Sequence, residues 1–359
     1  MKERVLDLIH CPKCGSHFNV KERVEKKDEI YSAILFCSLC LAEYRVVNYI
    51  PRLIDGYNYS DSWGKLWRET GQVVLDSYTG IPFYHDVIHG KYSQDGQGRD
   101  GYSPFGFEWP KDLRGQLILE VGPGTGCCTE HLIKTGAHLV SIDMSNAIDT
   151  FSEDILTMPN IDVVQGDINK PIFENGIFDK IWLFQVLQHT PSPVDTLKTM
   201  YRLLKKNGEI AFTSYAAVYK PWFLPIIQRI HPQTSWKLIN WFVPVFIPLK
   251  YGLQKVFYKF KMPFMAKVIR KITEPIDPRN IFFNAREGYA GDYPHGKLWE
   301  STHDKKLLMK YVIINTFDCI TPQYVNGANH QQIELWASEA AFSSIRTWGV
   351  GGVRATAFK

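Results

Sequence analysis

The sequence predicts an α/β protein whose main domain has a largely parallel β-sheet covered by helices on both faces. From Leu113 onward, buried β-like runs alternate with amphipathic helical runs, as in sheets whose parallel strands are joined by crossover helices. A glycine-rich segment, Gly122–Gly126, directly follows the first of these β-like runs. Two Cys-x-x-Cys pairs near the N-terminus indicate a small additional unit before the main domain.

Length and composition exclude several classes of protein. At 359 residues the chain is longer than most single cores, so we expect two or three units. Its 45% apolar and 22% charged residues are typical of globular rather than disordered proteins. A net charge of +4 does not by itself indicate nucleic-acid binding. There is no apolar secretory signal and no run of about 18 apolar residues, so we expect a cytoplasmic protein without a membrane span.

The first unit, residues 1–55, is predicted to be a zinc ribbon. Its four paired cysteines have the spacing of a tetrahedral thiolate site, with 22 residues between the pairs: Cys11, Cys14, Cys37 and Cys40. Pro12 and Gly15 favour the tight turn of the first pair. Four thiolates leave no open coordination position, so the zinc would be structural.

Residues 56–110 are predicted to be a linker and an arm that packs on the next domain. They are rich in Gly, Tyr, Ser and Asp, and they contain Trp63, Trp67 and Trp109.

The main domain, residues 111–216, is expected to supply five strands. These are predicted at Leu117–Val121, Leu139–Asp143, Asp162–Gln165, Phe178–Phe184 and Glu209–Ser214. The helices between them are predicted at Cys127–Thr135, Asn146–Leu156 and Val194–Leu204. Residues 301–339 are expected to complete the domain with a helix from 304 to 314 and an antiparallel hairpin, formed by Cys319–Val325 and Gln332–Ala337. Residues 340–359 are predicted to be a tail.

The glycine loop and an acid on the second strand predict a nucleotide-like ligand. Glycines let the backbone turn sharply and approach a ligand closely, and the following helix presents unpaired N–H groups. Asp143 ends the second strand, where an acid can accept hydrogen bonds from both ribose hydroxyls. The dinucleotide fingerprint Gly-x-Gly-x-x-Gly would need glycine at position 127, where Cys127 stands, so NAD is disfavoured.

Five segments resemble the successive motifs of class I S-adenosylmethionine-dependent methyltransferases. They are Glu-Val-Gly-Pro-Gly-Thr-Gly at 120–126, Ile-Asp-Met-Ser at 142–145, Gln-Gly-Asp-Ile at 165–168, Phe-Asp-Lys-Ile at 178–181 and Leu-Leu-Lys-Lys-Asn-Gly-Glu at 203–209. The chain also resembles bacterial methyltransferases of the type 11 group that carry an N-terminal zinc ribbon ending in Ile-Pro-Arg. Those proteins have Phe-Gly-x-x-Trp before the core, here Phe105–Trp109, and Leu-His-His-Thr-Pro after strand four. Here Gln188 replaces the first histidine and His189 is retained.

The resemblance implies a Rossmann-like seven-stranded sheet with an antiparallel last strand, and it assigns roles to individual residues. The methionine part of S-adenosylmethionine would be cradled by Gly122, Gly124 and Gly126. Asp143 would hold the ribose and Met144 would pack on the adenine. The rest of the cofactor site would be formed by Asp167, Ile168, Phe184 and Gln185. Glu120 would face the ammonium group of the cofactor or orient the loop.

His189 is the candidate general base, because it follows strand four beside the expected methyl group. A histidine that only hydrogen-bonds the loop is the alternative. Trp109, Tyr293 and His303 are weaker candidates for the acceptor pocket.

Residues 217–300 are predicted to form a helical insertion. No Asp or Glu occurs between Glu209 and Glu274, whereas ten Lys or Arg interleave with aromatic residues over positions 220–271. Three interpretations remain open: a lid over the active site, a surface for an anionic membrane or a lipid-linked substrate, and a site for a phosphate-rich partner. Leu238–Leu249, the longest uncharged stretch, has 12 residues and two prolines, so it would lie on the inner face of a membrane rather than cross it.

These observations favour methyl transfer to a small-molecule or lipid-linked acceptor. Two alternatives remain open: an RNA methyltransferase that uses the ribbon to bind RNA, and a non-catalytic scaffold that binds S-adenosylmethionine.

Overall fold

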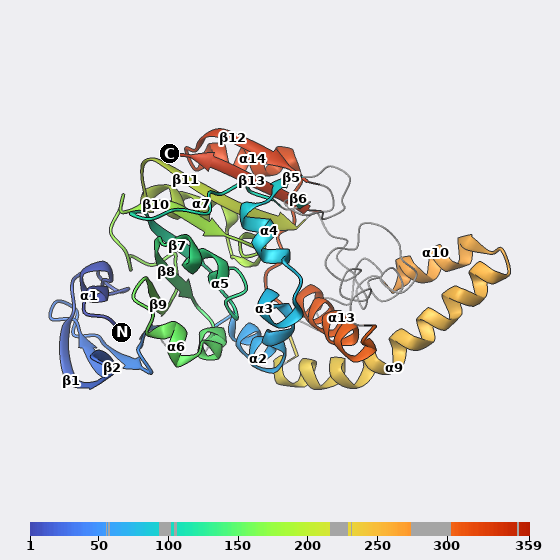
Figure 1. The fold of residues 1–359 in the computed structure, drawn as a ribbon, viewed down its shortest axis with the longest axis horizontal. Helices are drawn as coiled ribbons and strands as arrows, with labels where there is room; N and C mark the ends of the chain where they lie inside the picture. The colour runs from blue at the N-terminus through green and yellow to red at the C-terminus, as the bar shows by residue number, and fades with distance from the viewer. Residues whose placement is uncertain are drawn as a thin grey trace. The chain divides into compact units, whose positions relative to one another are not determined.

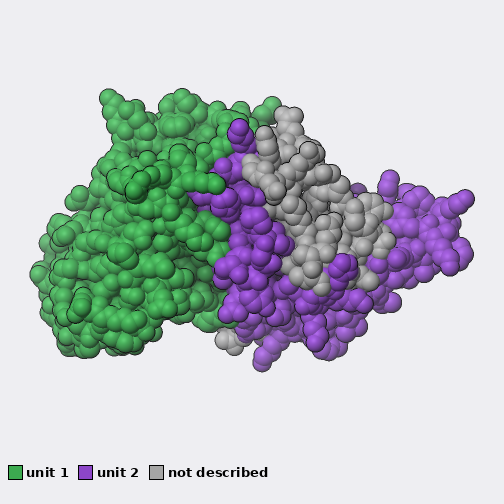
Figure 2. All heavy atoms as spheres, in the orientation of Figure 1, with its two compact units in different colours: residues 1–68, 107–218, 324–359 green, residues 69–106, 219–323 purple. Residues whose placement is uncertain are grey.

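The computed structural model describes residues 1–54, 56, 58–92, 102–103, 106–215, 229–230, 232–273, 303–349 and 352–359. The chain divides into two compact units, which are coloured green and purple in Figure 2. Unit 1 comprises Met1–Arg68, Phe107–Val218 and Tyr324–Lys359, and unit 2 comprises Glu69–Gly106 and Tyr219–Gln323.

Unit 1 contains the predicted α/β sheet (Figure 1). Seven of its strands lie in the order β9-β8-β7-β10-β11-β13-β12, which is 3-2-1-4-5-7-6 when they are numbered along the chain. Their bounds are Leu117–Val121 for β7, His138–Asp143 for β8, Ile161–Gly166 for β9, Phe178–Leu183 for β10, Leu204–Tyr215 for β11, Ser343–Trp348 for β12 and Gly352–Phe358 for β13. Among these seven, β13 alone runs in the direction opposite to the other six. The predicted class of fold is therefore confirmed.

The ribbon strands extend this same sheet. They are β1 (Asn19–Lys26), β2 (Glu29–Phe36), β3 (Glu43–Val47) and β4 (Ile50–Leu53), and a short helix, α1 (Val5–Leu8), precedes them. β4 pairs in parallel with β9, with Arg52 opposite Gln165. The four ribbon strands and the seven core strands thus form one sheet of eleven.

Two of the three connecting helices are shorter than predicted. The region expected to be one helix over residues 146–156 consists of η3 (Asn146–Thr150) and α6 (Glu153–Leu156). The Ser152 hydroxyl accepts a hydrogen bond from Ile155 N and so starts a new helix there. The helix expected at 127–135 is limited to α5 (Thr129–Leu132) and η2 (Ile133–Thr135), whereas α7 (Pro193–Leu203) agrees closely with its prediction.

The predicted position of the closing hairpin is wrong. The segment expected at Gln332–Ala337 lies in helix α14 (His330–Glu339), and that expected at Cys319–Val325 spans the end of helix α13 (Lys305–Ile320) and the non-regular segment after it. The hairpin is β12–β13, in the supposed tail. Asn329, interpreted as a turn residue, caps α14 by accepting a hydrogen bond from Gln332 N at 2.8 Å. An Asn that precedes a helix and one in a hairpin turn look alike in sequence.

The arm is largely helical rather than a linker. It contains α2 (Asp61–Thr70), η1 (Gly71–Val74), α3 (Asp76–Thr79), α4 (Phe83–His89) and the short strands β5 (Lys91–Tyr92) and β6 (Tyr102–Ser103).

In unit 2, the described part of the insertion is helical. It consists of α9 (Pro232–Lys259) and α10 (Pro263–Ile272), while residues 217–228 and 274–300 lie outside the described ranges. α9 packs on α13, where the Trp236 and Phe317 rings meet at 5.3 Å. No described helix combines the length and the apolar character that crossing a bilayer requires.

Candidate functional site

The glycine loop follows β7 at the point where the strand order reverses, which is where open α/β sheets bind ligands. Gly122, Gly124 and Gly126 all have positive φ, at 71°, 56° and 90°. A Cβ on Gly122 would lie 2.3 Å from Val186 Cγ2, and one on Gly126 would lie 2.7 Å from a Phe151 ring carbon. These positions therefore require glycine, both for backbone conformation and for space.

Asp143 links the end of β8 to this loop. Its Oδ2 accepts a hydrogen bond from Gly124 N at 3.2 Å, and its Oδ1 accepts one from Ser145 N at 2.8 Å. Burial raises the pKa of the carboxyl above its usual value despite these bonds. An acid held against a glycine turn fits the two hydroxyls of a ribose.

Glu120 is buried at the carboxyl end of β7, with a side chain that is oriented by two hydroxyls. Its Oε2 accepts hydrogen bonds from Thr129 Oγ1 at 2.7 Å and from Ser141 Oγ at 2.6 Å. Its Oε1 is buried and has no partner among the described residues. Burial raises the pKa of this carboxyl to about 7. Glu120 therefore links β7 to β8 and to the start of α5, and its second oxygen fits the ammonium group of a ligand.

The residues predicted for the adenine side follow β8 and β9. The Met144 carbonyl accepts hydrogen bonds from Gln165 Nε2 at 3.4 Å and from Asn58 Nδ2 at 3.3 Å. Asp167 accepts a hydrogen bond from the backbone N of Asn169, and Ile168 is buried. The strands thus bring these residues to the same edge of the sheet as the glycine loop.

Phe184 and Gln185 follow β10, next to the glycine loop. Phe184 is buried and stacks on Trp182, with centroids 5.8 Å apart. Gln185 has a φ of 57°, and its backbone N donates to Thr213 Oγ1 at 2.6 Å. A left-handed conformation in a residue other than glycine is a strained feature of the kind that concentrates at functional sites.

His189 is held by a backbone carbonyl and two aromatic rings. Its Nδ1 lies 3.1 Å from the Tyr324 carbonyl oxygen, which can only accept, so Nδ1 carries the proton and Nε2 of the neutral ring is an acceptor. The ring packs against Trp63 and Tyr215, with centroids at 4.9 and 5.5 Å. The neighbouring Gln188 is fully buried.

Sequence reasoning missed an aromatic segment of the arm that lies against the loop. Trp67 contacts Gly124, since a Cβ there would lie 3.3 Å from the indole. Trp63 stacks on Trp67 at 6.4 Å, and Tyr59 packs on Tyr324 at 5.2 Å. Trp63 and Trp67 are four residues apart on one face of α2, and Tyr59 lies in the turn before this helix. The four-residue spacing could have identified the two tryptophans.

Of the proposed pocket residues, Trp109 lies away from the glycine loop. Trp109 is buried, and its Nε1 donates a hydrogen bond to Glu209 Oε1 at 3.1 Å. Glu209 on β11 lies opposite Lys180 on β10. This pair of residues lies toward the amino ends of the parallel strands, away from the glycine loop. His303 belongs to unit 2, and Tyr293 lies outside the described residues.

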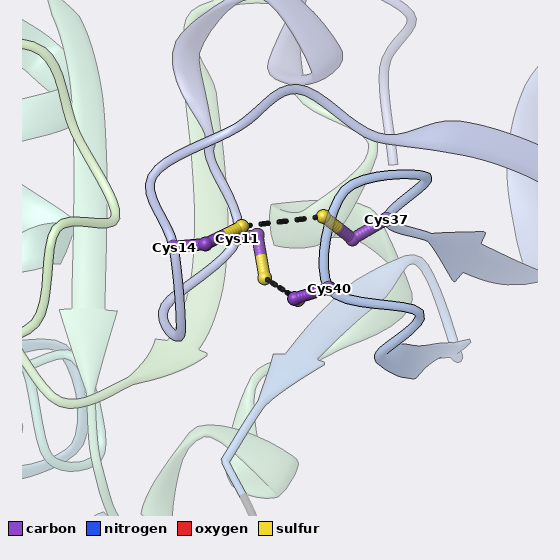
Figure 3. A group of neighbouring side chains, drawn as sticks. All are labelled: Cys11, Cys14, Cys37 and Cys40. Carbon is purple, nitrogen blue, oxygen red and sulfur yellow. Dashed lines mark hydrogen bonds between the residues drawn. The ribbon is translucent and has the colours of Figure 1, made fainter.

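The four paired cysteines meet in the ribbon (Figure 3). Their sulfur atoms all lie within 4.8 Å of one another, with Cys11–Cys40 at 3.5 Å and Cys14–Cys37 at 3.4 Å. The two turns are equivalent: Gly15 N donates to Cys11 O, and Leu41 N donates to Cys37 O. Four converging sulfurs fit a tetrahedral zinc ion with Zn–S distances of about 2.3 Å.

Part of the chain is similar in sequence to known methyltransferases. Residues 119–212 match the family model described as a methyltransferase domain. The ubiquinone biosynthesis O-methyltransferase of Pasteurella multocida is 33% identical over 127 residues, which are 32% of this chain and 52% of that protein. Its counterpart in Pseudomonas entomophila is 27% identical over 118 residues, which are 32% of this chain and 51% of that protein. The chain thus spans about half the length of the curated relatives it matches.

Solved structures give weaker overall likenesses. The structure of PigF with SAH has a TM-score of 0.40 and 13% identity, with 85% of this chain and 63% of that chain covered. Human N-acetylserotonin methyltransferase in complex with SAM has a TM-score of 0.38 and 10% identity, with 85% and 60% covered.

Proposed function

From the class I S-adenosylmethionine-dependent methyltransferase domain that the chain contains, we propose that it transfers a methyl group from this cofactor to an oxygen of a small-molecule acceptor. The observation that carries the proposal is the hydrogen bond from Gly124 N to Asp143, because a carboxylate held against a glycine turn at the switch point of the sheet is suited to bind a ribose. The curated relatives are O-methyltransferases of ubiquinone biosynthesis, which favours an oxygen acceptor.

In this reaction, some residues of the chain bind and orient the cofactor, and one accepts a proton from the acceptor. The bound cofactor supplies an electrophilic methyl group on sulfur. The glycine loop and Asp143 hold and orient it, and Glu120 meets its ammonium group. An acceptor hydroxyl must lose its proton as the new bond forms, and His189 takes it through Nε2. The Tyr324 carbonyl fixes the ring in the tautomer that can do so.

We further propose that the acceptor is linked to a lipid, because α9 presents an apolar face to solvent. Seven apolar side chains on α9 are exposed at helical spacing: Leu238, Trp241, Phe242, Val245, Leu249, Leu253 and Val256. A second set at the complementary positions is buried: Trp236, Ile239, Val243 and Ile247. One face of α9 therefore packs within unit 2, and the other face remains uncovered among the described residues.

The charged residues of α9 and α10 are all basic. From Pro232 to Ile272 there are eight Lys or Arg and no acid. Phe264 and Ile272 extend the exposed apolar surface onto α10. Apolar side chains bordered by lysines match a bilayer with anionic headgroups, whereas a soluble acceptor would need no such surface.

The charges of the ribbon give less support to the alternative that the acceptor is RNA. Four of the ribbon's basic side chains are partnered with acids: Lys26 and Lys27 with Glu153, Arg23 with Glu25, and Lys21 with Glu43. Paired charges attract phosphate weakly, so a lipid-linked acceptor is the better-supported choice.

Incubation with S-adenosylmethionine carrying a labelled methyl group tests the proposal. Fractions of aqueous metabolites, extracted lipids and RNA would be supplied separately. We expect label in the lipid extract, and much less label with an Asp143→Ala variant at a subsaturating cofactor concentration. Label in the aqueous fraction would limit the proposal to a soluble acceptor, and label in RNA would overturn it.

A further inference from the structure

A second cluster of metal-binding side chains lies beside the four cysteines. One ligand atom from each of His10, His17 and Glu174 lies within 4.8 Å of the others. His10 Nε2 is 3.8 Å from Glu174 Oε1, and the two imidazole centroids are 4.5 Å apart. Neither the thiolate site nor the glycine-loop site uses these residues.

The first cysteine turn brings the two histidines together. Cys11 N donates to Ser16 O at 2.8 Å, so the chain folds back on itself between these residues. His10 and His17 stand immediately outside this closed turn, one on each side. The same turn that gathers the cysteines therefore sets the spacing of the histidines.

The acid comes from the core rather than from the ribbon. His10 N donates to Ile172 O at 2.7 Å, and Ile9 forms an antiparallel bridge with Phe173. These backbone contacts hold the loop after β9 against the ribbon and bring Glu174 next to His10.

The exposure of the three side chains suits a partly open metal site. The His10 side chain is 6% exposed, whereas that of Glu174 is 60% exposed. Imidazole nitrogens and a carboxylate are ligands for zinc and for similar divalent transition metals. Three protein ligands with an open side leave a fourth position for water.

We propose that His10, His17 and Glu174 bind a second divalent transition-metal ion. Two ligands come from the ribbon and the third comes from the core loop, so the ion fastens the ribbon to the loop after β9. It differs from the thiolate zinc in its ligands and in its open position.

Zinc content after loading the full chain with excess zinc and desalting tests this proposal. The wild type should hold about two zinc ions per chain, and His17→Gln and Glu174→Gln about one each. Both substitutions are at exposed positions, which favours folding, whereas His10 is buried and is left unchanged. Asp28→Asn, an exposed acid elsewhere on the ribbon, should retain about two.

Cobalt loading identifies which ion each variant loses. Glu174→Gln should keep the intense sulfur-to-cobalt absorption of a thiolate site while binding one cobalt fewer, and Cys37→Ser should lose that absorption. A wild type that holds a single zinc, or equal zinc content in the wild type, His17→Gln and Glu174→Gln, would overturn the proposal.

Discussion

The glycine-loop edge of the sheet buries a charged side chain, whereas the helix pair α9–α10 exposes apolar ones. At the sheet edge a carboxylate is turned inward, with Glu120 only 1% exposed. On α9 an aromatic side chain is turned outward, with Trp241 73% exposed. The first arrangement suits a polar ligand enclosed by protein, and the second suits an extended apolar and anionic surface. Buried charged side chains and exposed apolar side chains are unusual in proteins, so they indicate what each region contacts.

The largest expected effect is at the loop itself. Gly122→Ala adds a Cβ 2.3 Å from Val186 Cγ2 at a φ of 71° and should weaken binding of S-adenosylhomocysteine by about 3 kcal/mol or more, about 100-fold. Gly115→Ala is a matched control, because Gly115 has a φ of 80° but no atom within 4 Å of the added Cβ. Equal binding by the two variants in calorimetry would show that the loop does not approach the cofactor.

Charge reversal on the helix pair tests the other side of the comparison. Replacing Lys255, Lys259 and Lys261 by Glu should abolish flotation with anionic liposomes, because each lysine near the surface contributes about 1 kcal/mol. Wild-type flotation should fade as salt rises.

The same charge change elsewhere separates a local effect from net charge. Lys134, Lys198 and Lys206 are exposed lysines of unit 1, and their replacement by Glu should leave flotation intact. Cofactor affinity should be unchanged in the α9–α10 variant. A wild type that never floats at low salt would remove the membrane role and favour the lid interpretation.

The sequence predicted the sheet edge better than the helix pair for a physical reason. The glycine loop and Asp143 are fixed by local backbone requirements, so short motifs reveal them. The exposed and buried faces of α9 are both apolar, and only the packing of α13 distinguishes them. The hairpin was misplaced because Asn329 serves equally well as a turn residue and as a helix cap. Glu174 joins His10 through a backbone bridge between distant segments, which no local pattern encodes.

Glu120 gives the sheet edge a pH-dependent stability. Burial raises its pKa from 4.5 to about 7, so the folded state binds a proton that the unfolded state has released. This contribution to stability is fully present below pH 4.5 and is lost as pH rises through about 7. Denaturant unfolding should therefore show the wild type losing about 2 to 3 kcal/mol across this range relative to Glu120→Gln. If the free energy of unfolding changed with pH equally in the two proteins, the raised pKa of Glu120 would be contradicted.

A smaller effect is expected in the ribbon, at the two equivalent turns. Gly15 and Leu41 occupy corresponding positions with φ of 75° and 60°, but Leu41 carries a side chain that is 71% exposed. Leu41→Gly should therefore stabilise the zinc-loaded ribbon by about 1 kcal/mol, because glycine relieves the left-handed strain. Leu39→Gly, at an equally exposed residue without positive φ, should not stabilise it. Chelator-induced unfolding monitored by circular dichroism distinguishes the two variants.

Calorimetric titration of the wild type with S-adenosylhomocysteine and with NAD tests the central claim most directly. The site described at the ends of β7 and β8 should bind S-adenosylhomocysteine at about one per chain, and Asp143→Ala should weaken this binding by about 1 to 3 kcal/mol. NAD should give no binding heat, because Cys127 interrupts the dinucleotide glycine pattern. Binding of NAD, or S-adenosylhomocysteine affinity that Asp143→Ala leaves unchanged, would contradict the account.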